Sequence, residues 1–121
     1  PTRAENTAPD FLNVTWVDRA PSNADVQPRQ LYCILAQKAP RWALFQCPCK
    51  CGCVITLSLQ IAHVPHWNVY KGRGGLPSIY PSIWRNSGCY SHFWIEDGRI
   101  VWCGDTGTRP VSRNRSFRAQ E

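Results

Sequence analysis

The sequence lacks several features that would assign it to a familiar class. No apolar run approaches the roughly 18–20 residues of a membrane-spanning helix, and no stretch has the form of a signal peptide. No two of the seven cysteines are spaced as C-x-x-C, which excludes a thioredoxin-type motif and the usual zinc-ribbon knuckle. Residue 1 is Pro and Met is absent, so we expect that the initiator has been removed. We therefore expect a soluble protein without a membrane partner.

Charged residues are few as well. They make up 18% of the 121 residues, against 43% hydrophobic and 12% aromatic residues, and this balance is typical of a folded chain. The net charge is +6, and four of the arginines fall within the last 13 residues. A basic tail of this kind is more often solvated than bound to RNA or DNA, so we do not expect a nucleic-acid partner.

Helical patterning is also missing. No window of 12 or more residues has an apolar stripe of period 3.6, and ten prolines work against long helices. Short runs of β-branched and aromatic residues alternate with turn signals instead, and Asp97-Gly98 predicts a final tight hairpin. We expect an all-β fold, either a small compact sandwich or a partly open barrel. The predicted strands are residues 11–17, 31–36, 42–47, 53–61, 66–71, 92–96 and 99–103.

The chain reads as one domain between two polar ends, because its length is near the commonest domain size. Residues 1–10 and 104–121 are rich in polar, Pro and Gly residues, so we expect a mobile N-terminal segment and a basic flexible tail. The β domain between them covers residues 11–103. Within it, residues 72–91 are rich in Gly and Pro and are expected to form a long irregular loop, a common place for a functional site.

The cysteines of CPCKCGC alternate along the chain. Seven is an odd number, which argues against a fully paired secreted disulfide scaffold. Thiolates two residues apart on a strand point the same way, so several could surround a tetrahedral zinc ion. Such a cysteine-only site would be structural, and reduced cysteines without metal are the alternative. The predicted zinc ligands are Cys47, Cys49, Cys51 and Cys89, with Cys103 as the next candidate.

The tripeptide PSI occurs twice, and each copy places a serine, Ser78 in the first and Ser82 in the second, between a proline and an apolar residue. A serine becomes a nucleophile when a nearby histidine takes its proton and backbone N–H groups stabilise the oxyanion. His92 could be this base, a zinc ligand or an ordinary core residue. The backbone after Ser82 and the preceding glycine run could supply the N–H groups. His63 and His66, beside a proline, look like surface loop residues.

Residues 46–103 resemble a family of small bacterial proteins that recur in operons for ubiquitin-like protein conjugation and have been described as serine proteases with a Ser–His dyad. The resemblance is carried by CPCKCG, by PSIWRNSGCYSHFWI and by an Asp-Gly turn followed by RIVWC. It implies that Ser82 is the nucleophile and that His92, ten residues later, is the general base. Ser78 is less favoured because Trp-Arg-x-Ser-Gly-Cys follows Ser82 directly.

The same resemblance implies a substrate and a location. We expect a deubiquitinase-like serine peptidase of the bacterial cytoplasm that cleaves at the C-terminal tail of a ubiquitin-like protein, in a precursor or a conjugate. An extended tail can bind along a strand edge or a glycine-rich segment, so we predict that Gly74, Gly75 and Trp84 bind the substrate. Arg73 or Arg85 could attract acidic groups of that partner.

Several alternatives stay open at this stage. The imidazole of His92 would be oriented by a backbone carbonyl or by a carboxylate. The carboxylate candidates are Asp97, Glu96 and Asp105. The chain departs from the family at Lys50, where Gly is common, and at the extra Cys53, so the set of metal ligands is open. The rival functions are a non-enzymatic zinc-binding interaction module and a metallohydrolase with His92 as a zinc ligand.

Overall fold

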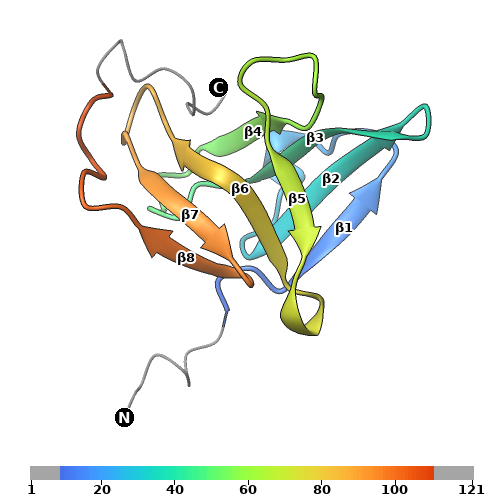
Figure 1. Cartoon of the computed structure of the whole chain (residues 1–121), viewed down its shortest axis with the longest axis horizontal. Helices are drawn as coiled ribbons and strands as arrows, with labels where there is room; N and C mark the ends of the chain where they lie inside the picture. Colours follow the sequence, from blue (N-terminus) through green and yellow to red (C-terminus); the bar gives the residue numbers. More distant parts are fainter. Residues whose placement is uncertain (1–8, 111–121) are drawn as a thin grey trace.

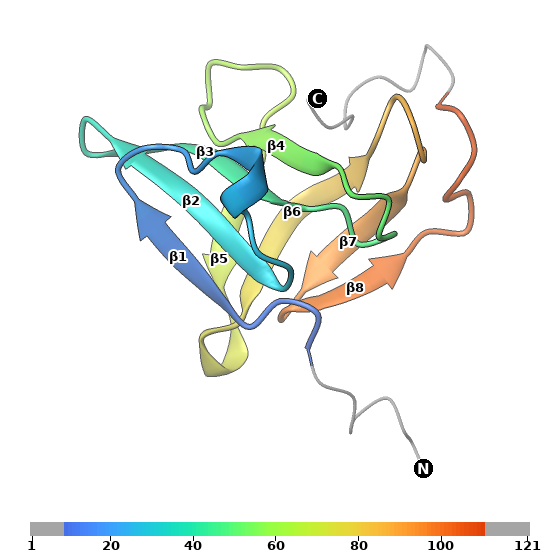
Figure 2. The same cartoon turned by 180° about the vertical axis from the view of Figure 1, so that it is seen from behind.

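Two four-stranded β-sheets pack face to face in the computed structural model, which describes residues 9–110 (Figures 1 and 2). The first sheet contains β1 (Asn13–Val17), β2 (Gln30–Ala36), β3 (Ala39–Gln46) and β4 (Val54–Ser58), in that order. The second contains β5 (Asn68–Lys71), β6 (Pro77–Trp84), β7 (His92–Glu96) and β8 (Arg99–Trp102). Short 3-10 turns are η2 (Asn23–Asp25) and η3 (Arg73–Gly75). The predicted all-β sandwich is confirmed, and no helix within residues 9–110 is both long and apolar enough to span a membrane.

The core lies between the sheets because apolar residues alternate along the strands. Leu31 and Cys33 of β2 point inward, as do Phe93 and Ile95 of β7, and all four are almost fully buried. Strands β3, β4 and β6 contribute to the same buried cluster. Since neighbouring side chains on a strand point to opposite faces, this alternation places His92 on the outer face of β7.

The last two strands form the predicted tight hairpin. Glu96 pairs with Arg99 across β7 and β8, which leaves the two-residue turn Asp97-Gly98. Both turn residues have positive φ, 47° and 76°, as a type I′ hairpin turn requires. The antiparallel register continues to Phe93 opposite Trp102, so the start of β7 and the end of β8 lie side by side.

The prediction of a long irregular loop over residues 72–91 is wrong in its central part. This part forms β6, which pairs with β5 and β7. The composition was misleading because a strand tolerates proline at its first residue and within a bulge. Pro77 is the first residue of β6, and Pro81 lies in the irregular stretch where the three residues between Ile79 and Ile83 oppose a single residue of β7, Trp94.

The ends of the chain are described only in part. Residues 1–8 and 111–121 lie outside the described residues, and with them most of the predicted mobile N-terminal segment and of the predicted basic tail. The boundary predicted at residue 104 does not end the folded contacts, because the backbone N–H of Gly107 donates to the carbonyl of Tyr90 at 2.9 Å.

Candidate functional site

Ser82 and His92 lie in contact on neighbouring strands of the second sheet. His92 is the cross-strand partner of Trp84, and Ser82 precedes Trp84 by two residues on β6. The Oγ atom of Ser82 lies 3.2 Å from Nε2 of His92. Ser82 keeps 5% of its surface exposed. The Ser78 hydroxyl, in contrast, accepts a hydrogen bond from the backbone N–H of Asp97.

A carboxylate contacts the other nitrogen of the same imidazole. Nδ1 of His92 lies 2.6 Å from Oδ1 of Asp105, whose side chain is half exposed. A carboxylate can only accept here, so it favours the tautomer with the proton on Nδ1 and leaves the lone pair of Nε2 for the Ser82 hydroxyl. Of the three candidate carboxylates, Asp105 is thus the one in contact with the ring. Asp97 and Glu96 lie at the opposite end of β7.

Asp105 is held in place by the turn that follows β8, defined here as residues 103–108. The N–H of Cys103 donates to the carbonyl of His92 at 2.9 Å, and the N–H of His92 donates to Oγ1 of Thr106 at 2.9 Å. The hydroxyl of Thr108 donates to the Asp105 carbonyl at 2.6 Å. The turn is therefore fastened to the first residue of β7, and the carboxylate is fixed relative to the imidazole.

Trp84 fixes the remaining freedom of the ring. Its indole lies flat against the imidazole of His92, with ring centroids 4.2 Å apart and an angle of 1° between the planes. The indole N–H donates to the carbonyl of Thr108 at 3.1 Å, which ties Trp84 to the same turn. A stacked aromatic face also favours a positively charged partner. The arrangement can thus hold an imidazole that accepts a proton from Ser82.

Gly74 and Gly75 are not brought together with this pair. They belong to η3, where the N–H of Arg73 donates to Oδ1 of Asp97. Asp97 is five residues from His92, or about 16 Å along an extended strand. The glycine run therefore lies too far away to stabilise an oxyanion at Ser82. A Cβ added at either glycine would meet nothing within 4 Å, so this backbone is open to a close approach.

Four cysteine sulfurs form a second group. They belong to Cys47, Cys49, Cys51 and Cys89, and they all lie within 4.8 Å of one another. The Sγ atom of Cys47 lies 3.4 Å from that of Cys49 and 3.6 Å from that of Cys89, and the Sγ atoms of Cys51 and Cys89 are 4.0 Å apart. A tetrahedral zinc ion with Zn–S bonds of about 2.3 Å requires sulfurs about 3.8 Å apart, so these side chains fit the metal. Cys53 and Cys103 do not belong to this group.

The turn that presents the cysteines uses positive φ angles. The N–H of Lys50 donates to the carbonyl of Cys47 at 3.1 Å, and the N–H of Cys47 donates to the carbonyl of Cys53 at 2.9 Å. Lys50 has φ 70° and Gly52 has φ 90°, conformations that glycine adopts at no steric cost. Lys50 thus keeps the turn that a glycine would form, at a local cost of about 1 kcal/mol.

Arg85 and Ser91 stabilise negative charge on this cluster. Arg85 is only 2% exposed, and its Nη1 lies 3.5 Å from Sγ of Cys89 and 3.6 Å from Sγ of Cys51. Burial opposes ionisation of Cys89, but hydrogen bonds from Ser91 and from neighbouring thiols lower its pKa to about 6. The prediction that Arg85 attracts a partner at the surface is wrong, because this side chain is buried against thiols.

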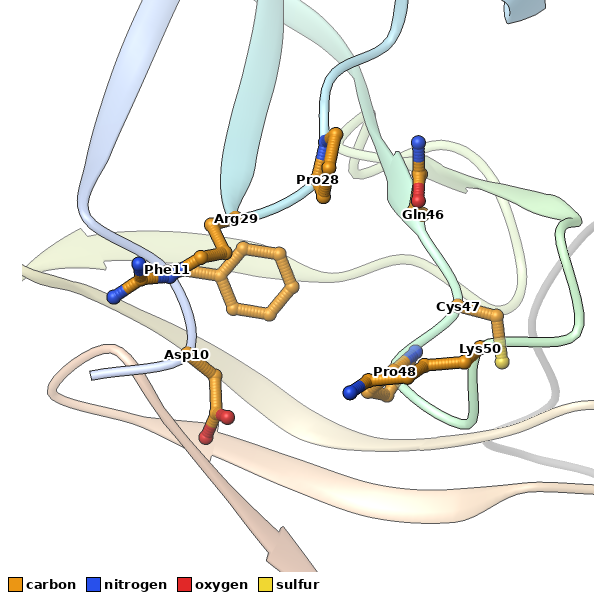
Figure 3. Close-up of a pocket in the computed structure, with 8 residues that line it drawn as sticks. All are labelled: Asp10, Phe11, Pro28, Arg29, Gln46, Cys47, Pro48 and Lys50. Carbon is orange, nitrogen blue, oxygen red and sulfur yellow. The ribbon is translucent and has the colours of Figure 1, made fainter. Parts of the chain in front are cut away.

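Figure 3 shows a pocket beside the cysteine turn. It lies between the first described residues, the segment before β2 and the CPCK turn. Its walls are Asp10, Phe11, Pro28, Arg29, Gln46, Cys47, Pro48 and Lys50. Ser82, His92 and Asp105 do not line it, so the pocket is separate from the Ser–His pair.

Comparison with known proteins gave one match. The family model described as bacterial ubiquitination-like system serine protease (BubE) matches residues 16–103, well over half of the chain. The match extends the resemblance toward the N-terminus, contains Ser82 and His92, and ends two residues before Asp105. Comparison with curated proteins and with solved structures gave no match.

Proposed function

The chain belongs to the family of bacterial ubiquitination-like system serine proteases, and from this premise we propose that Ser82, His92 and Asp105 form its catalytic triad. One observation carries the proposal: a single chain of hydrogen bonds runs from the Ser82 hydroxyl through both nitrogens of His92 to the Asp105 carboxylate. Three residues linked in this order are the arrangement that activates serine in acyl transfer.

The residues divide the chemistry as follows. Ser82 Oγ attacks the scissile carbonyl while Nε2 of His92 takes its proton, and the imidazolium then donates that proton to the leaving group. Asp105 holds the ring in the required tautomer and stabilises the imidazolium, as does the face of Trp84. Water, activated by His92, then hydrolyses the acyl-enzyme and restores the Ser82 hydroxyl.

We further propose that the substrate is the C-terminal tail of a ubiquitin-like protein, as a precursor or a conjugate. The family description places the chain in a ubiquitination-like system, which supports a partner of this kind. Trp84 adjoins His92, so it would contact substrate residues next to the scissile bond. Gly74 and Gly75 would contact an extended tail about five residues away, because a strand residue spans about 3.3 Å.

Covalent labelling tests the catalytic proposal. A serine-directed fluorophosphonate should modify Ser82, as read by mass spectrometry, and His92→Ala should abolish the labelling while its circular dichroism stays that of the folded protein. Ser78→Ala is the matched control, because Ser78 occupies the other PSI tripeptide and contacts Asp97 instead of a histidine. Cleavage of a ubiquitin-like precursor should follow the same pattern.

The same variants distinguish the rival functions. A zinc-binding interaction module predicts no labelling and no effect of Ser82→Ala on any activity. A metallohydrolase that uses His92 as a zinc ligand predicts turnover that chelation abolishes and a fluorophosphonate does not touch. Labelling at Ser78 in place of Ser82 would contradict the proposed nucleophile.

We also propose that the four-cysteine group holds a structural zinc ion. The sulfur spacing fits a tetrahedral ion, and the nearby Arg85 guanidinium stabilises thiolate ligands. Without the ion the thiols differ: burial raises the pKa of Cys47 and Cys49, whereas at Cys89 hydrogen bonds outweigh burial and lower the pKa. Four protein ligands leave no open position, so the ion would supply folding energy and no catalysis. Zinc analysis should find one tightly held ion per chain, and Cys49→Ser should lose it. The reduced cysteines also support a location in the bacterial cytoplasm.

A further inference from the structure

A second set of metal-type ligands lies at the candidate active site itself. His92, Cys103 and Asp105 each offer one ligand atom, and these atoms lie within 4.8 Å of one another. None of the three belongs to the four-cysteine group. Imidazole, thiolate and carboxylate are the three donor types that bind zinc in proteins, and three protein ligands with one open position are common in zinc sites.

The backbone assembles this set before any metal arrives. The hairpin register places Cys103 beside His92, and the Cys103 N–H donates to the His92 carbonyl at 2.9 Å. The N–H of Thr106 donates to the Cys103 carbonyl at 3.1 Å, which closes the turn that carries Asp105. A cation would therefore bind side chains that are already gathered, and the half-exposed Asp105 gives it a route from solvent.

The ligand types select the cation. A thiolate and a carboxylate supply two negative charges, and a neutral imidazole supplies the third ligand, which suits a borderline-soft divalent ion such as Zn²⁺. On binding, the Cys103 thiol releases its proton to solvent. Nδ1 of His92 also loses its proton while Nε2 takes one up from solvent, so the imidazole stays neutral, its proton resides on Nε2, and one proton is released in total.

We propose that His92, Cys103 and Asp105 form a second, weaker zinc site whose occupation reversibly inhibits the peptidase. The inhibition rests on the proposed function, whereas the metal site does not. With the metal on Nδ1, the Nε2–H group donates to Ser82 Oγ at the observed 3.2 Å contact, and metal-bound histidines usually have such an acceptor on the second nitrogen. An Nε2 that carries a proton cannot accept one from Ser82, so the nucleophile is not activated.

The first test counts zinc ions. The full chain is dialysed against a series of increasing free Zn²⁺ concentrations, and the zinc bound per chain is measured by elemental mass spectrometry. Wild type should bind two ions per chain, one tightly in the four-cysteine group and one more weakly. Cys103→Ala should keep the first ion and bind the second at least roughly tenfold more weakly. Ser82→Ala should bind both. Equal binding curves for wild type and Cys103→Ala would overturn the site.

The second test reads the consequence at Ser82. Zinc at a concentration that fills the second site should block fluorophosphonate labelling of wild type, and dialysis into zinc-free buffer should restore it. Cys103→Ala should be labelled at the wild-type rate without zinc and should resist the block. Filling the site without slowing the labelling would overturn the inhibition. If wild type is never labelled, the proposed function fails, and the zinc counts still decide the metal site.

Discussion

Residues 9–110 contain two Ser–His hydrogen bonds, and in each pair the histidine lies beside a tryptophan. In the second sheet Ser82 contacts His92, which stacks flat on Trp84. At the end of β4 in the first sheet, Oγ of Ser58 lies 2.6 Å from Nδ1 of His63. The Trp42 ring is tilted by 52° relative to His63, with centroids 5.6 Å apart.

The two pairs differ in what else their atoms contact. Ser58 has no exposed surface, and its hydroxyl oxygen already accepts the backbone N–H of Gln60. Within residues 9–110, no carboxylate contacts His63, whereas Asp105 anchors the second nitrogen of His92. The Ser58 pair therefore fastens the loop after β4. A Ser–His contact favours catalysis only when the second ring nitrogen is anchored and the hydroxyl has residual access.

Replacing each serine with alanine should give the largest difference between the two pairs in the rate of substrate cleavage. Ser82→Ala removes the nucleophile, and loss of this group in a serine protease lowers kcat by about 10⁶-fold. Ser58→Ala should leave the rate of substrate cleavage unchanged, because its hydroxyl is buried in a loop contact. Single-turnover cleavage of the ubiquitin-like precursor measures both. A comparable loss in Ser58→Ala, with the fold retained, would contradict the distinction.

Removing the charge of Asp105, which anchors His92, should give the next largest loss in kcat. Asp105→Asn places an amide where the carboxylate accepts the Nδ1 proton, so the ring can adopt the wrong tautomer, and kcat should fall by about 10⁴-fold. Asp97→Asn is the matched control, since Asp97 belongs to the hairpin turn and its carboxylate contacts the Arg73 N–H. Equal activity of the two variants would show that His92 needs no carboxylate.

Substitutions of the two tryptophans beside the histidines should differ less in their effect on kcat. Trp84→Leu removes a stacked face worth about 0.5–1.5 kcal/mol, which corresponds to a loss in kcat of about two- to tenfold if the stack supports the imidazolium. Trp42→Leu should leave kcat unchanged, because its ring packs against His63 of the other pair. Steady-state kinetics of the two variants separate effects on kcat from effects on KM. An effect confined to KM would show that Trp84 contacts the substrate without supporting the imidazolium.

The two serine variants should rank in the opposite order in stability: Ser58→Ala should lose more free energy of unfolding than Ser82→Ala. Ser58→Ala leaves the Gln60 N–H without its acceptor, so the free energy of unfolding should fall by about 1–3 kcal/mol. Ser82→Ala loses one side-chain hydrogen bond to a histidine that reaches solvent, at a cost of about 1 kcal/mol. Urea unfolding curves compare the midpoints. A lower midpoint for Ser82→Ala would show that its hydroxyl also has a structural role.

The sequence predicted the parts of the site that depend on local patterns. Alternating apolar residues and the Asp-Gly turn identified β7 and β8, and the spaced PSI and SHFWI strings paired Ser82 with His92. Three members of the four-cysteine group, Cys47, Cys49 and Cys51, followed from side chains that alternate on one segment. These features depend on residues close together in the chain or on one resemblance, whereas Cys89 joins the group from a distant segment.

The rest depends on contacts between distant segments. Asp105 was only one of three carboxylate candidates, because the turn that carries it is set by hydrogen bonds to Tyr90 and His92. One signal was available: extending the hairpin register from Glu96 opposite Arg99 places residue 103 opposite His92. β6 was missed because its prolines occupy a strand start and a bulge, which composition alone does not reveal.

The position of Asp105 beyond the last strand has a practical consequence for anyone who shortens this protein. A fragment ending at residue 103 would keep the eight strands found in residues 9–110 and the whole segment matched by the family. It would also lose the carboxylate and the threonines that fasten the turn to β7. Such a minimal version should fold as the same sandwich and be inert, so a shortened protein should extend at least through Thr108.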